Sequence, residues 1–349
     1  VHGASGAVTI GYGGANNIRS GVSGKSVMIR SGDFRFDPDT GWIEPTSGPS
    51  QYGRVRDDWG NWFGVHNSHP LWHYVLPARY LRRNPDVTYP DSRRQVRTPR
   101  NPRVFANKPP QKRFHSFEQS GRFTSACGPS IYRDTILFGR SGVTHAFTCE
   151  PFHNVIQRSV IREDGVSFSG ERADDGERDF FASADRWSRP VFTRTGPDGA
   201  LWFADMYRYM IEHPHWLPKN GQDELRPHFR SGDTFGRIYR IVPKGKPLRE
   251  VPRLAGRKPA ELVDVLSSEN GTLRDMAHRL LIEADAKAVD EATAKAAKAD
   301  EGVAARQKDA RSFLEREGYQ VPEGVGEDDD PIEPSGSHGA LSKKVQKLT

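Results

Sequence analysis

The chain has 349 residues, which is enough for one large domain or two smaller ones with a sizeable core. Its 34 glycines and 25 prolines, together with 10% aromatic residues, favour many short strands joined by tight turns. The net charge is +6, and no run approaches the roughly 18 apolar residues of a membrane-spanning helix. We therefore expect no transmembrane segment in this chain.

The first 250 residues repeat one pattern, in which a short apolar run, a polar turn and a second apolar run follow each other. The polar turns lie at Asp39-Thr40-Gly41, Asp58-Trp59-Gly60-Asn61 and Pro197-Asp198-Gly199. A small antiparallel sheet cannot bury both of its faces alone, so neighbouring sheets must stack around an axis. We therefore predict an all-β fold, a β-propeller over 1–250, with a β-sandwich as the alternative.

The N-terminal stretch "VHGASGAVTIGYGG" begins inside an apparent strand at Val1. We therefore expect a propeller truncated at its N-terminus, with about four blades and no closed ring. No signal peptide precedes this stretch. The cellular compartment of the protein is therefore inferred below from its resemblance to a known family.

Much of the positive charge lies at 79–113, inside a Pro/Arg-rich insertion that we place at about 78–120. Such a segment is typical of a surface that binds nucleic acid, or of a solvated loop whose arginines pair with carboxylates. No recognition helix or RNA-binding motif accompanies the charge. The solvated loop is favoured, and no nucleic-acid partner is expected.

Two cysteines occur, Cys127 and Cys149, and neither belongs to a C-x-x-C or C-x-x-C-H motif, so the chain has no haem-attachment motif. Both lie in strand-like segments of one repeat unit, flanking a stretch of hairpin length. They form one disulfide if the protein is exported, or they remain two buried free thiols.

Polar residues return where the inner strand of each unit ends, and in a propeller these strand ends converge on one mouth. The candidate residues for binding a substrate or cofactor are His2, His66, Asn67, Glu150, His153, Asn154, Asp205, Tyr207 and Arg208. Leu201, Phe203 and Asp205 alternate with Trp202, Ala204 and Met206, so one face of this strand carries Leu, Phe and Asp. Asp205 and Arg208 are expected to face this mouth near His66 and His153. The alternative is that each polar group only satisfies the turn at its own strand end. No metal site is predicted, because alternation along a strand separates neighbouring histidines.

Beyond residue 250 the pattern changes to helices. Two amphipathic runs in 251–285, separated by Glu269-Asn270-Gly271, predict an antiparallel helix pair like one HEAT unit. Residues 286–349 are rich first in Ala, Lys and Glu and then in acidic residues, which predicts a charged helix leading into a disordered tail.

Several stretches resemble the propeller of planctomycete-type membrane-bound dehydrogenases, which are similar to the glucose/sorbosone dehydrogenase superfamily. They include "RSGDFRFDPDTG", "FTCEPFHNVI" and "RPVFTRTGPDGALWFADMYRYMIEHPHW". The resemblance covers about residues 1–285. It implies a six-bladed propeller followed by the start of a HEAT-repeat region, in an exported, periplasmic or otherwise extracytoplasmic protein that carries a cytochrome c domain in a longer chain.

The resemblance also implies pyrroloquinoline quinone and Ca²⁺ as cofactors of a sugar or alcohol dehydrogenase, acting on a carbohydrate-type hydroxyl or aldehyde. The superfamily's catalytic base would fall before Val1, and its arginine motif is replaced here by Gly48-Pro49-Ser50-Gln51-Tyr52-Gly53. No catalytic residue is therefore assigned. The alternatives are a non-catalytic carbohydrate-binding or scaffold propeller that works with a c-type cytochrome domain, and a Ca²⁺-dependent lactonase-like hydrolase using Glu150, Asn154 and Asp205.

Overall fold

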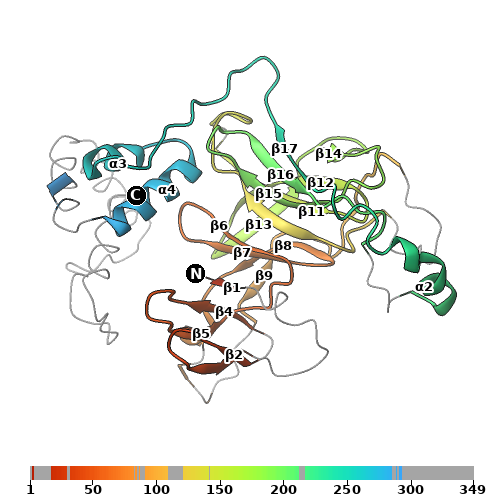
Figure 1. Ribbon diagram of the computed structural model, residues 1–349, viewed down its shortest axis with the longest axis horizontal. Helices are drawn as coiled ribbons and strands as arrows, with labels where there is room; N and C mark the ends of the chain where they lie inside the picture. The colour runs from red at the N-terminus through yellow and green to blue at the C-terminus, as the bar shows by residue number, and fades with distance from the viewer. Residues whose placement is uncertain are drawn as a thin grey trace. The chain divides into compact units, whose positions relative to one another are not determined.

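The computed structural model describes residues 2–3, 17–29, 32–81, 83–84, 86, 91–108, 121–140, 142–211, 217–284, 288 and 291–292. The chain divides into two compact units, Val1–Leu248 and Arg249–Thr349. Most of the regular structure in the described residues is β-sheet, arranged as several separate antiparallel sheets (Figure 1). The prediction of a mainly β protein is thus confirmed for the first unit.

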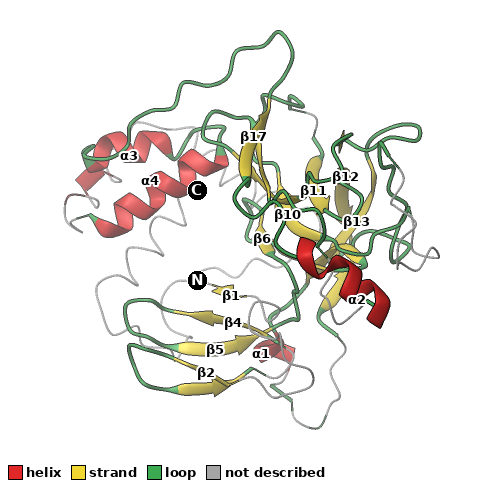
Figure 2. Ribbon diagram, turned by 45° about the vertical axis from the view of Figure 1, so that its right-hand side comes forward, coloured by secondary structure: helices red, strands yellow, loops and turns green. Residues whose placement is uncertain are grey.

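The N-terminal part contains two small sheets. Strands β1 (His2–Gly3), β4 (Asp33–Phe36) and β5 (Ile43–Thr46) form one, and β2 (Asn17–Arg19) pairs with β3 (Ser26–Met28) in the other. Figure 2 shows β4 and β5 side by side. The predicted turn between them forms because Asp37 Oδ1 accepts the Asp39 amide at 3.0 Å and Gly41 adopts φ 69°.

The third sheet is a meander in chain order, formed by β6 (Arg54–Arg56), β7 (Trp62–His66), β8 (His69–Tyr74) and β9 (Arg93–Gln95). Its first turn is closed by Asp57, whose Oδ1 accepts the amides of Trp59 and Asn61 at 2.9 and 2.8 Å. A short helix, α1 (Ala78–Leu81), lies between β8 and β9. The described parts of the basic insertion thus include one strand of this sheet and are not only loop.

The fourth sheet is again a meander in chain order, formed by β10 (Cys127–Ile131), β11 (Thr144–Glu150), β12 (Val155–Asp164) and β13 (Ser167–Arg172). A further short strand, β14 (Phe181–Ala182), pairs with the start of β12. This sheet contains much of the apolar core, including Phe147 and Ile156, which are fully buried.

The fifth sheet consists of β15 (Pro190–Thr195), β16 (Leu201–Asp205) and β17 (Arg237–Ile241) among the described residues. The predicted alternation in β16 is confirmed, since Leu201, Phe203 and Asp205 are buried while Trp202 and Ala204 are partly exposed. Between β16 and β17 lie α2 (Lys219–Leu225) and a 3₁₀ turn, Arg226–His228.

The first strands of the last three sheets, β6, β10 and β15, pack against each other, with β10 in contact with both β6 and β15. Ser130 Oγ lies 2.7 Å from Thr193 Oγ1, and Thr193 Oγ1 donates to the Gly128 carbonyl at 3.2 Å. Gly128 permits this approach, because a Cβ there would collide with the backbone of Val191. Consecutive sheets therefore share buried contacts at their first strands.

The second unit contains the predicted helix pair, α3 (Pro259–Val265) and α4 (Gly271–Glu283), which pack against each other (Figure 2). Asn270 caps α4 by accepting the Leu273 amide at 2.9 Å. Leu262, Ala277 and Leu281 form part of its buried core. Of the predicted charged helix and tail, 286–349, the structure describes residues 288, 291 and 292, and the rest lies outside the described residues. No helix among the residues that the structure describes is long and apolar enough to cross a membrane.

Candidate functional site

The turn after β11 contains a buried carboxylate and imidazole. Glu150 is fully buried and accepts the Ser125 amide at 2.8 Å and the Ser125 hydroxyl at 2.5 Å, with further donation from Thr124. His153 Nε2 accepts the Gly121 amide at 2.9 Å, so its Nδ1–H is the group that faces Glu150 Oε1 at 3.3 Å. Both residues thus fasten the 121–125 loop to the end of β11.

Asp205, at the end of β16, is 2% exposed. Its Oδ1 accepts the backbone amides of Arg189 and Tyr207 at 2.6 and 2.9 Å. In the described part of the chain, these amides are the hydrogen-bond partners of the carboxylate, and neither His66 nor His153 is among them. The carboxylate thus links the end of β16 to the residue that precedes β15, and its hydrogen bonds do not bring it together with either imidazole.

One arginine that the sequence did not single out joins the two strand ends. Arg189 is 7% exposed, and its guanidinium donates to the carbonyls of Pro151 (2.9 Å), Phe152 (3.3 Å), Arg208 (3.0 Å) and Tyr209 (2.8 Å). The turn after β11 and the turn after β16 are therefore held by a single side chain. The predicted residues at the ends of β11 and β16 therefore lie near each other, and it is the backbone carbonyls of the two turns that Arg189 connects.

The other predicted residues of these turns also bond to the backbone. Asn154 adopts φ 61°, and its side-chain amide donates to the carbonyls of Arg186 and Ser188. Tyr207 adopts φ 54°, and its ring lies 3.8 Å from the Arg237 guanidinium carbon. Arg208 donates to the carbonyls of the two preceding residues. These contacts fix the shape of the strand ends.

The remaining candidates lie in other sheets. His66 faces His69 across the β7–β8 pair, with ring centroids 6.0 Å apart, and stacks on Trp72. Burial and the nearby Arg100 lower the pKa of His66, and they lower that of His69 to about 4, so both rings are neutral at neutral pH. The Asn67 amide donates to Gln51 Oε1 at 3.1 Å. His2 pairs with Arg35 in the β1–β4 ladder, and its side chain lies outside the described residues.

A buried ion pair, which no pattern in the sequence indicates, joins β4 to β6. Asp33 is fully buried and accepts Ser50 Oγ at 2.6 Å and Arg54 Nη1 at 3.0 Å. The Arg54 guanidinium carbon lies 4.0 Å from the Tyr74 ring centre. Burial and the Asp33 charge raise the pKa of Tyr74. No local spacing marks these residues, because each comes from a different strand or loop.

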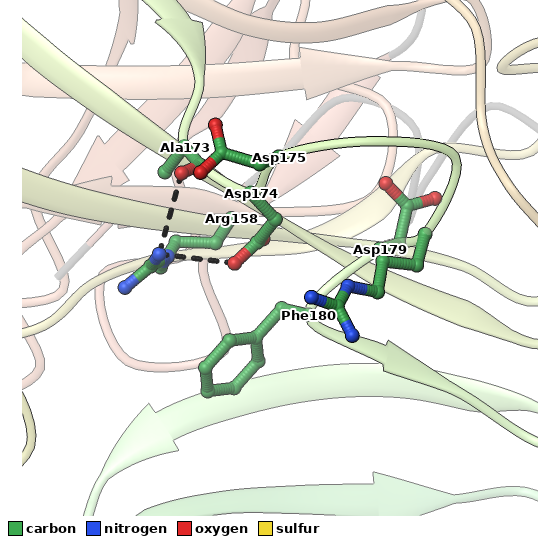
Figure 3. Close-up of a pocket in the computed structure, with 7 residues that line it drawn as sticks. Arg158, Ala173, Asp174, Asp175, Asp179 and Phe180 are labelled. Atoms are coloured by element: carbon green, nitrogen blue, oxygen red, sulfur yellow. Dashed lines mark hydrogen bonds and ion pairs between the residues drawn. The ribbon is translucent and has the colours of Figure 1, made fainter.

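A pocket of about 390 Å³ lies where the β13–β14 connection curls over β12. It is lined by Arg158, Ala173, Asp174, Asp175, Arg178, Asp179 and Phe180 (Figure 3). Its volume falls within the range of about 300–1,000 Å³ that is usual for small-molecule sites. No pattern in the sequence indicates this pocket, since six of its seven lining residues belong to the irregular β13–β14 connection, whose path only the fold defines.

The floor of the pocket is an arginine–carboxylate pair. Arg158 Nη2 lies 3.0 Å from Asp174 Oδ1 and donates to the Ala173 carbonyl, as the dashed lines in Figure 3 show. The guanidinium also lies over the rings of Phe138 and Phe180, at 4.7 and 5.6 Å. Within the described residues, Asp174 Oδ2 and Arg158 Nε are buried without a hydrogen-bond partner.

The charges around this pocket are mixed. Burial raises the pKa of Asp174 and that of Asp179, while Arg158 opposes the shift at Asp174. Asp179 is bonded to Gln157 Nε2 at 2.9 Å and to the Phe105 amide at 2.8 Å, so it supports the wall. Asp175 and Arg178 are exposed at the rim. A carboxylate, a guanidinium and an aromatic ring thus lie within reach of one small ligand.

The quinone and Ca²⁺ implied by the sequence resemblance do not fit the predicted residues. Glu150, Asp205 and Asn154 direct their polar atoms to neighbouring loops and turns, and Arg208 donates to backbone carbonyls. Among the residues that the structure describes, no three His, Cys, Asp or Glu side chains are grouped to hold a metal ion. We therefore derive no reaction step through either cofactor.

The first unit is thus mainly antiparallel β-sheet, and the second contains a helix pair. The family model "Domain of unknown function (DUF7133)" matches residues 2–245, nearly the whole first unit. The chain therefore belongs to the DUF7133 family. No curated protein and no solved structure matches the chain.

Proposed function

We propose that the first unit is an extracytoplasmic, propeller-type module that binds a carbohydrate-type ligand, in a longer protein whose other domains carry out redox chemistry. The propeller interpretation is supported by meandering sheets that follow each other along the chain and pack at their first strands, β6, β10 and β15. The resemblance to the planctomycete-type dehydrogenases supports the carbohydrate class and a cytochrome c domain as the redox partner.

The observation that carries the proposal is the pocket beside β12. Sugar hydroxyls both donate and accept, so they can bond to the carboxylate and guanidinium groups that line this pocket. The Phe180 ring offers an apolar surface for the C–H face of a sugar, and Asp175 and Arg178 lie at the rim for further hydroxyls. A binding module is favoured over the dehydrogenase, because Glu150, Asp205 and Arg208, which were expected to hold a cofactor, are bonded within the protein instead.

Calorimetric titration of the full chain with glucose, sorbitol and glucosamine tests the proposal. Asp175→Ala and Arg178→Ala should each weaken binding about tenfold, since each removes a charged hydrogen bond of about 1.5–3 kcal/mol or part of it. Arg162→Ala is the matched control, because Arg162 is an exposed arginine on the same strand as Arg158. Equal affinities in all three variants would place the ligand elsewhere.

A second measurement separates binding from oxidation. The chain is incubated with pyrroloquinoline quinone and Ca²⁺, and the sugar-dependent reduction of a dye is followed. The proposal expects sugar binding without dye reduction. Sugar-dependent turnover would favour the quinoprotein dehydrogenase and overturn the non-catalytic assignment.

A further inference from the structure

Cys127 and Cys149 face each other across two adjacent strands. They are register partners in the antiparallel pair of β10 and β11. Directly opposed residues in such a pair have Cα atoms about 4.5–5.5 Å apart, which lies inside the range of about 4.4–6.8 Å found for disulfides. The geometry of the backbone thus already meets the first requirement for a bridge, although both thiols are free in this structure.

The two thiols share one apolar cluster with Phe147, Ile156 and Leu201. Cys149 is fully buried, and Cys127 is 8% exposed. Burial raises the pKa of both thiols, so little thiolate is present once the sheet has folded. A thiol oxidant must therefore react while β10 and β11 are still assembling, and a bond formed then is protected from reductants afterwards.

We propose that Cys127 and Cys149 form an intramolecular cross-strand disulfide when the chain folds in an oxidising compartment. Its occurrence in the cell rests on the extracytoplasmic location in the proposed function. The oxidant is a small-molecule or protein disulfide. One thiolate attacks it and releases one thiol, and the second thiolate then displaces the other, so that two protons and two electrons leave the protein and two thiols are formed.

The composition of the chain makes the connectivity unambiguous. Cys127 and Cys149 are its two cysteines, so any disulfide within one molecule must join them. The bridge would close a loop of about twenty residues, which restricts the unfolded chain and stabilises the fold. It would link β10 covalently to β11, and β10 also packs against β15.

The test refolds the full chain from denaturant in a glutathione redox buffer and counts free thiols. The unfolded product is labelled with a maleimide and weighed by mass spectrometry, and non-reducing electrophoresis reports on linked dimers. We expect a monomer that takes up no label before reduction and two labels after it. A folded monomer that takes up two labels overturns the proposal, and so does a wild-type product linked mainly between molecules.

A stability comparison provides a second readout. A phosphine reductant, added during refolding, should lower the Tm of the wild type by roughly 5–10 °C. The double variant Cys127→Ala/Cys149→Ala should show no shift between the two conditions. An unchanged Tm in the wild type, with the bond confirmed by mass, would show that the bridge adds no constraint and would overturn its stabilising role. Sugar binding is not used in either readout, so failure of the carbohydrate proposal leaves this test intact.

Discussion

Replacing Arg189 with methionine should destabilise the first unit more than any exposed substitution in the same sheet. Methionine fills much of the same volume but donates no hydrogen bond. The carbonyls of Pro151, Phe152, Arg208 and Tyr209 would then lose their shared partner in a buried place. At about 1 kcal/mol for each net hydrogen bond, the free energy of unfolding should fall by about 4 kcal/mol.

The matched control is Arg194→Met. Arg194 lies in β15, the strand that Arg189 directly precedes, and its side chain is exposed. This substitution should change the free energy of unfolding by less than about 0.5 kcal/mol. Arg189→Lys should give an intermediate loss, because an ammonium group cannot reach both turns at once. Urea denaturation followed by tryptophan fluorescence measures all three variants, and the Arg189→Met midpoint should also fall by about 10 °C in a thermal scan. A loss below about 1 kcal/mol for Arg189→Met would refute the idea that one side chain holds both turns.

Three further outcomes are expected. Asp205→Ala should cost about 2–4 kcal/mol of stability in urea denaturation, because two buried backbone amides lose their acceptor, and an unchanged midpoint would contradict this role of the carboxylate. Gly128→Ala should lower the Tm and cost about 2–4 kcal/mol of stability, because the residue has φ 51° and its new Cβ would meet the Val191 carbonyl. A Tm equal to that of the wild type would show that β10 and β15 can move apart to accept the Cβ. The pKa of His145 is lowered to about 4 by burial and by Arg158, so protonation favours the unfolded chain. Stability should therefore be complete above pH 6.5 and fall as the pH drops towards 4, and denaturation of His145→Gln at the two ends of this range should show a smaller fall than the wild type.

The sequence predicted the parts of the fold that depend on local patterns. The turns at Asp39-Thr40-Gly41 and Pro197-Asp198-Gly199, the alternation in β16 and the helix pair after residue 250 all follow from periodicity and turn residues near each other in the chain. Polar residues were also expected at the ends of β11 and β16, and they lie there. Whether the sheets complete a propeller remains a prediction.

The destination of those polar side chains was not predictable in the same way. Glu150 meets Ser125, a residue from a loop 25 positions earlier in the chain. The sequence around a carboxylate at a strand end is the same whether that carboxylate binds a ligand or accepts a backbone amide. Arg189 gave no signal, because one arginine before a strand is common and its partners are carbonyls, which every residue has. The pocket beside β12 depends on how 173–180 curls, and no periodic pattern encodes an irregular path.

The Arg189 contacts also bear on how the first unit opens. The turn after β11 and the turn after β16 lie in different sheets, yet neither can leave its place without breaking bonds to the same guanidinium. Amide hydrogens in the two turns should therefore exchange with solvent through one joint opening event and at similar rates. Since residues about 40 and 20 positions away in the chain meet at this side chain, that opening should close slowly, after both sheets have re-formed.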